Sequence, residues 1–164
     1  MLVKFCDSVP EQMARAMSLW KYTHLPTEMP DWSLRDDGAI AITAQTDLHR
    51  FCVVMTRHIF LLTSAAGRLL QRRHGFAVDV SSRYRPPASH DDCRMVYATS
   101  ALRPVIDNMG LVRIRVPSGD RALDLALSKE AFVETSARAR ALQWHLGRDS
   151  MAEIVSLVER DRGD

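Results

Sequence analysis

Hydrophobic residues recur at steps of three and four through the middle of the chain, which is the spacing of one face of an α-helix. Arginines occupy the other side of this segment, as expected for a helix that packs one face against a core. Thr46 or Asp47 can cap its start, and Gly75 can end it. The pattern therefore predicts a single long helix over 48–74 that forms the spine of the domain.

The same segment leaves a second interpretation open. Residues 51–55 and 59–63 are short apolar runs, and such runs also suit two buried strands followed by a short helix. We favour the single helix because its apolar face continues without a break to Leu69.

Alternation of apolar and polar residues predicts strands on both sides of this helix. A hairpin is expected from 32–35 and 39–43, because the Asp-Asp-Gly sequence between them favours a tight turn. A second hairpin is expected over 111–127, and a half-buried strand over 76–85.

The two hairpins carry similar sequences. Arg-Asp-Asp-Gly-Ala-Ile-Ala-Ile, which starts at Arg35, resembles Ser-Gly-Asp-Arg-Ala-Leu-Asp-Leu, which starts at Ser118, and a helix with a capping residue follows each. This order is consistent with an old duplication or with a common unit that simply occurs twice. Between these two interpretations, we favour the common unit.

Helical spacing returns in the remaining segments. Ser128 is a good N-cap, and Gly110 and Gly147 are suitable helix ends. These signals predict an α+β fold, in which a small antiparallel sheet of hairpins packs against the long central helix and C-terminal helices. The further helices are expected over 10–24, about 95–109, 128–147 and 150–160.

Length and composition are those of one soluble globular domain over 1–164, with 161–164 expected to fray. The chain has 164 residues, 46% hydrophobic residues and a net charge of +2. The most apolar stretch, 51–66, carries Arg57 and His58, so it is too polar to span a membrane. Only three of the 22 basic residues are lysine, which suggests a bacterial protein from a GC-rich genome. Three widely spaced cysteines without a CxxC pair favour the cytoplasm, and we expect no metal and no cofactor.

Arginines at alternate strand positions are the first candidate site. Alternation places both members of each pair on one face of a sheet, and adjacent strands would bring all four guanidinium groups to one surface. Such a surface suits phosphates, nucleic acid or an acidic protein, whereas the simpler interpretation is four solvated side chains. These candidates are Arg83, Arg85, Arg113 and Arg115.

A second basic strip lies near the predicted end of the long helix. It consists of Arg68, Arg72 and Arg73, and the helix dipole alone favours cations there. If it bordered the strand arginines, nucleic-acid binding would gain support.

Two clusters allow catalytic hypotheses. His90, Asp92 and Cys93 fall in one loop, where they suit acid–base or thiol chemistry, although an N-cap is the simpler role. His49 and Cys52 would lie on adjacent turns of the predicted helix, where Cys52 is more simply a core residue.

The sequence contains no Walker A, GxGxxG, GxSxG or HExxH motif, so it favours a protein without catalytic activity. Our first hypothesis is therefore a binding or regulatory protein, of the adaptor, chaperone, inhibitor or immunity type, that acts through a protein–protein interface. The alternatives are a nucleic-acid-binding protein with an arginine-bearing sheet face and a small enzyme that uses His90, Asp92 and Cys93. We also consider a homodimer formed through the acidic, amphipathic helix over 150–160, which could instead dock on the basic strip of its own chain.

Overall fold

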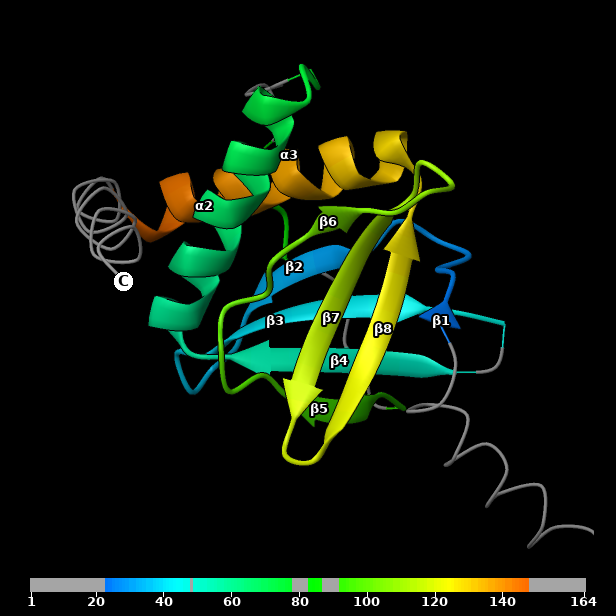
Figure 1. Ribbon diagram of the computed structural model, residues 1–164. Coiled ribbons are helices and arrows are strands. Elements are labelled where there is room, and N and C mark those ends of the chain that lie inside the picture. The colour runs from blue at the N-terminus through cyan, green and yellow to red at the C-terminus, as the bar shows by residue number, and fades with distance from the viewer. Residues whose placement is uncertain (1–22, 48, 78–82, 87–91, 148–164) are drawn as a thin grey trace, which may run out of the picture.

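The protein is an α+β fold built from two four-stranded sheets. The structure is a computed structural model, and it describes residues 23–47, 49–77, 83–86 and 92–147. In Figure 1, β7 and β8 cross in front of β3 and β4 at a steep angle, and α2 and α3 cross each other beside the sheets.

The strand orders are β1-β8-β7-β6 in one sheet and β2-β3-β4-β5 in the other. Each sheet contains one parallel pair of strands, which is β1 with β8 in one sheet and β4 with β5 in the other. The remaining pairs in both sheets are antiparallel. The elements are β1 (Thr23–His24), β2 (Asp31–Leu34), β3 (Ile40–Gln45), β4 (Arg50–Met55), α2 (Arg57–Arg73), β5 (Arg94–Tyr97), β6 (Val105–Ile106), β7 (Val112–Ser118), β8 (Arg121–Leu127) and α3 (Lys129–Leu146).

The core lies between the inner faces of the two sheets and the apolar faces of both helices. Both sheets contribute fully buried side chains, such as Phe51 from β4 and Leu123 from β8. Phe60 of α2 and Leu142 of α3 are also inaccessible to solvent. Each such side chain contributes roughly 1.5–3 kcal/mol of hydrophobic stabilisation. The two sheets and two helices therefore depend on one shared core.

The prediction of a single long helix over 48–74 is wrong. Residues 50–55 form β4, and α2 begins only at Arg57, after Thr56 accepts a hydrogen bond from the Ile59 amide on its side-chain oxygen, at 3.2 Å. β4 lies between β3 and β5 and is buried on both faces, so its apolar residues run continuously and also match a helical spacing. The alternative with a strand at 51–55 was correct for that strand, whereas 59–63 belongs to α2.

Thr46 closes the turn between β3 and β4 instead of capping a helix. Its amide donates to the His49 carbonyl at 2.8 Å, and its hydroxyl accepts from the His49 amide at 3.1 Å. These bonds satisfy the backbone of the turn, so the chain reverses here and β3 and β4 pair.

The predicted helix over 95–109 is also wrong. Residues 94–97 form β5, which completes a strand–helix–strand connection with β4 and α2. Pro104 interrupts the helical spacing because it has no amide hydrogen to donate. Gly110, with φ of +80°, closes the tight turn between β6 and β7.

Several predictions are confirmed. The hairpin of 32–35 with 39–43 is β2 and β3, and the hairpin over 111–127 is β7 and β8. Ser128 caps α3 by accepting from the Ala131 amide at 3.1 Å.

Other predictions fall partly or wholly outside the described residues. Of the strand predicted over 76–85, residues 78–82 are not described and 83–85 have no strand conformation. The helix predicted over 10–24 lies outside except for its last two residues, which form β1. The helix over 150–160, the tail 161–164 and the homodimer inferred from that helix lie wholly outside.

The chain contains two copies of one structural unit, related by a constant shift of 72 positions. Gly38 turns between β2 and β3 with φ of +81°, and Gly110, which is 38 plus 72, turns between β6 and β7 with φ of +80°. Ile40 pairs with Met55 and Val112 pairs with Leu127, so the strand register is the same in both. Thr56 and Ser128, the N-caps of α2 and α3, are also 72 positions apart. The first unit therefore spans 23–75 and the second 95–147.

Sequence identity between the units is concentrated in the helices. The shift aligns the buried phenylalanines, the small residues at the middle of each helix, one arginine and one buried glutamine. The matching pairs are Phe60 and Phe132, Thr63 and Thr135, Ser64 and Ser136, Ala65 and Ala137, Arg68 and Arg140, Leu70 and Leu142, and Gln71 and Gln143.

The two units exchange their first strands. β1 of the first unit pairs with β8 of the second, with Thr23 opposite Asp124. β5 of the second unit pairs with β4 of the first, with Met95 opposite Cys52, which is the same register after the shift of 72 positions. Each unit therefore completes the sheet of the other.

Candidate functional site

A groove of about 600 Å³ runs along the exposed side of α2, and we call it the α2 groove. Its floor is the apolar stripe of the helix, in which Leu62 is half-buried and Leu69 is 37% exposed. The opposite wall comes from the segment after β5 and from β7. The lining residues are His58, Ile59, Leu62, Ala65, Ala66, Leu69, Thr99, Ser100, Ala101, Arg103, Arg115 and Pro117.

The α2 groove combines an apolar floor with basic edges. Arg103 and Arg115 have exposed side chains on the wall, and His58 is exposed near the start of the helix. No carboxylate lines it among the described residues. This composition suits a ligand with apolar groups and negative charge.

A second groove of about 530 Å³ lies beside α3, and we call it the α3 groove. Glu134 and Arg138 of α3 line it, and the shift of 72 positions aligns them with Leu62 and Ala66 of the α2 groove. Asp31 likewise aligns with Arg103. The two grooves therefore occupy equivalent places in the two units.

In the α3 groove the chain supplies a segment of its own, residues 83–85. The Leu34 amide of edge strand β2 donates to the Tyr84 hydroxyl at 3.1 Å, and the Tyr84 ring lies 4.7 Å from the His145 ring of α3. Tyr84 also packs against the core cluster. Tyr84 of this segment thus bridges an edge strand and a helix.

The two grooves differ in charge: the α3 groove contains both carboxylates and arginines, whereas the described lining of the α2 groove contains arginines without carboxylates. In the α3 groove, Asp31 and Glu134 line the same cavity as Arg83 and Arg85. Arg138 forms ion pairs with both carboxylates, at 3.4 Å to Asp31 and 3.2 Å to Glu134. The α2 groove carries Arg103 where the α3 groove carries Asp31.

The four strand arginines do not form one surface. Arg83 and Arg85 line the α3 groove, Arg115 lines the α2 groove, and Arg113 lies beside β1. The strand neighbours of β7 are β6 and β8, so the adjacency assumed from sequence is absent among the described strands. An arginine-rich sheet face is therefore not supported.

Arg113 is held in local interactions. Its guanidinium donates to the Thr23 hydroxyl at 2.7 Å and lies 3.5 Å from the Asp107 carboxylate. Desolvation acts to raise the pKa of Asp107, but hydrogen bonds from the Leu111 and Met109 amides and the Arg113 charge together lower it below its ordinary value. Arg113 thus links the β6–β7 turn to the exchanged strand β1.

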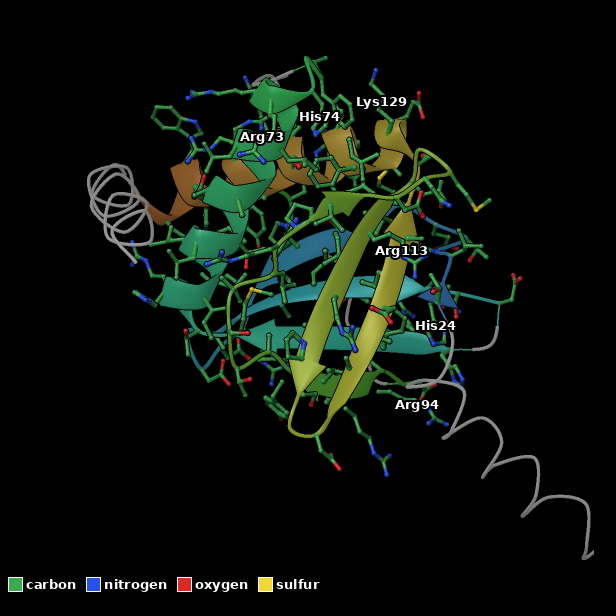
Figure 2. The ribbon with its side chains drawn as sticks, in the orientation of Figure 1. His24, Arg73, His74, Arg94, Arg113 and Lys129 are labelled. Carbon is green, nitrogen blue, oxygen red and sulfur yellow. The ribbon has the colours of Figure 1, made fainter. Side chains whose placement is uncertain are left out.

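The helix arginines lie elsewhere. Figure 2 shows Arg73 and His74 at the end of α2, well apart from Arg113. Arg68 is half-buried where α2 meets α3; burial lowers its pKa, and the neighbouring charges of Arg140 and Arg72 lower it further. This cluster is therefore a second basic region, separate from β7.

The catalytic hypotheses gain no support from the geometry. His49 and Cys52 have separate surroundings: His49, just before β4, has its ring centroid 6.0 Å from that of His24, whereas Cys52 of β4 lies in a small cluster with Ala41. Burial, with Cys52 and Asp92 nearby, raises the pKa of Cys93 despite the Arg50 charge. A raised pKa leaves the thiol protonated and weakly nucleophilic at neutral pH.

The described residues also contain no candidate metal-binding site. His90 lies outside the described residues. Within the described ranges no three His, Cys, Asp or Glu side chains are grouped as a metal would require.

Comparisons with known proteins give no further guidance. No family model, no curated protein and no solved structure matches the chain. Within the described ranges, neither α2 nor α3 could span a membrane. The sequence did not predict the α2 groove, because its walls come from both units. Of its lining residues, only Arg115 was a candidate site residue from sequence.

Proposed function

We propose that this protein is a non-catalytic binding protein that takes an extended, acidic segment of a protein partner into the α2 groove. One observation carries the proposal: the equivalent α3 groove already holds a segment of the chain, residues 83–85, through the aromatic anchor Tyr84. The chain thereby provides an internal example of how this groove type binds a peptide.

The chemistry of the α2 groove supports a partner segment with both apolar and acidic side chains. Leu62, Ala66 and Leu69 offer an apolar floor, and burying apolar surface on them is favourable by roughly 25 cal/mol per Å². Arg103 and Arg115 favour carboxylates through charge-assisted hydrogen bonds. Edge strand β6, the counterpart of β2, lies at the outside of its sheet, as a peptide-binding edge does.

The experiment uses short fluorescent peptides that copy the sequence around Tyr84, with both arginines either kept or replaced by glutamate. Anisotropy titrations with the full chain should give tighter binding for the acidic peptide. The Arg103→Glu/Arg115→Glu variant should weaken that binding at least tenfold, equal to about 1.4 kcal/mol, and should favour the basic peptide.

The matched control is Arg73→Glu/Arg121→Glu, which changes the net charge equally at exposed positions that do not line the α2 groove. Equal affinity for the acidic and basic peptides, or equal weakening by the control, would overturn the proposal. Binding of a single-stranded oligonucleotide that is lost in the control variant and falls steeply with salt would favour the nucleic-acid alternative instead.

A further inference from the structure

Two arginines and two glutamines lie where α2 packs against α3, and we call them the helix-crossing cluster: Arg68, Gln71, Arg140 and Gln143. Arg140 of α3 spans the crossing seen in Figure 1, since its guanidinium donates to the side-chain carbonyl of Gln71 at 3.2 Å. Gln143 follows Arg140 by three positions, and Gln71 follows Arg68 by three, so each pair shares one side of its helix. The shift of 72 positions relates the two pairs, so each unit supplies half of the cluster.

The two glutamines of the cluster differ in their hydrogen bonds. Gln71 is fully buried; its carbonyl accepts from Arg140, and its amide donates to the Ala77 carbonyl at 2.9 Å. Gln143 is 3% exposed, yet its amide nitrogen has no hydrogen-bond partner among the described residues. Buried donors in folded proteins nearly always have an acceptor, because an unpaired one is costly. The Gln143 amide therefore indicates that an acceptor belongs at this place.

The same place is positively charged. The neighbouring charges of Arg140 and Arg72 add to the effect of burial and lower the pKa of Arg68, so the three guanidinium groups lie within reach of one another's fields. Arg72 follows Arg68 by four positions and lies on the same side of α2. No carboxylate in the described ranges forms an ion pair with Arg68 or Arg72. A group of like charges beside a buried donor favours an anion with several acceptor atoms.

We propose that the crossing of α2 and α3 binds a phosphate group, either free or carried by a small organic molecule. The guanidinium groups of Arg68 and Arg72 and the side-chain amide of Gln143 donate to its oxygens. A phosphate group suits this set, because it carries about two negative charges near neutral pH, has several strong acceptor oxygens and accepts bidentate bonds from arginine. None of these three residues lines the α2 groove, so this site goes beyond the proposed peptide binding.

The first experiment measures Tm of the full chain against inorganic phosphate, with sodium chloride at equal ionic strength as the reference. Phosphate should raise Tm with a dependence on concentration that gives an apparent affinity. Arg68→Gln/Arg72→Gln should weaken that affinity at least about tenfold, because it removes both charge-assisted donors. Without phosphate this variant should be no less stable than the unaltered chain, because it removes like charges that repel each other.

The matched control for charge is Arg94→Gln/Arg121→Gln, at exposed positions of β5 and β8. It removes the same two charges and should leave the phosphate affinity unchanged. The control also measures the general stabilisation that phosphate gives proteins through its exclusion from their surface.

The second experiment tests the glutamines. Gln143→Met keeps a similar shape but removes the unpartnered donor, so Tm without phosphate should be unchanged or higher, whereas phosphate affinity should fall about tenfold. Gln71→Met is the matched control, because it removes two observed hydrogen bonds. It should lower Tm with and without phosphate, while the rise that phosphate produces remains.

The source of the phosphate group is distinguished by calorimetric titration with inorganic phosphate and with adenosine monophosphate. Tighter binding of the monoester would assign the site to an organic phosphate, and equal or weaker binding would assign it to the free ion. Three results would overturn the proposal: a phosphate effect no larger than that of chloride, equal weakening in Arg94→Gln/Arg121→Gln, or full phosphate affinity in Gln143→Met.

Discussion

The two units share one backbone plan but differ in what fills the space beside each helix. Beside α3, Tyr84 and its neighbouring arginines lie in the groove; beside α2, the equivalent groove has an apolar floor and basic edges. The positions that pack inward, such as Phe60 and Phe132, are the same in both. The positions that face the grooves differ, for example Leu62 with Glu134. The comparison teaches that the shared residues maintain the fold, whereas the differing residues give each groove its own chemistry.

The largest expected effect tests whether the units are equivalent in stability. Phe60→Ala and Phe132→Ala each remove a buried ring from the shared core, and each should cost about 3–5 kcal/mol of unfolding free energy in urea. Both variants should show a single transition. Two separate transitions in either would mean that the units unfold independently, contrary to the exchanged strands.

A smaller effect is expected at the equivalent turns. Gly38→Ala and Gly110→Ala place a side chain at φ near +80°, where an L-residue is disfavoured by about 1–2 kcal/mol. No atom lies within 4 Å of a side-chain carbon added at either position, so backbone conformation alone determines the cost. The two losses in urea unfolding should agree closely; a large difference would break the equivalence of the units.

The helix caps should give the next effect. Thr56 and Ser128 accept from the amides of Ile59 and Ala131, so Thr56→Ala and Ser128→Ala should each cost about 1 kcal/mol. Thermal unfolding measures the losses. Thr56→Ser, which retains the cap, should restore most of the stability, and a cost as large as that of alanine would contradict the cap assignment.

The smallest expected effect distinguishes the units by pH. Asp107 in the second unit has a lowered pKa, and its counterpart in the first unit is Arg35. A lowered pKa stabilises the fold above the unfolded-state pKa, and this contribution is lost as pH falls through the folded-state value. Asp107→Asn should therefore flatten the acid side of a stability–pH profile slightly, and an unchanged acid side would contradict this assignment.

Much of the fold could be predicted from local signals. The turns after Leu34 and Val116 and the Ser128 cap depend on residues close in sequence, and these predictions are confirmed. The helix expected over 48–74 failed because β4 is buried on both faces, so its alternation disappears. In such a strand the apolar run carries no information about which secondary structure it adopts.

The repeat was only half recognised from sequence. The sequence comparison aligned the hairpin turn at Gly38 with the hairpin turn at Gly119. This alignment is out of register, because the glycine equivalent to Gly38 is Gly110. Sliding the chain along itself by 72 positions aligns Phe60 with Phe132 and Gln71 with Gln143, which was the available signal. The groove walls were beyond prediction, because Arg103 and Leu62 meet only through the exchange of strands between units.

The strand exchange has a consequence for how the protein is made. Thr23 needs Asp124 as its pairing partner, so the first strand of the sheet leaves the ribosome about a hundred residues before the strand that completes it. At about 5–20 residues per second, this is a wait of roughly 5–20 seconds. The early half of the nascent chain therefore spends that time with exposed backbone donors and acceptors, and slower translation should increase its demand for chaperones.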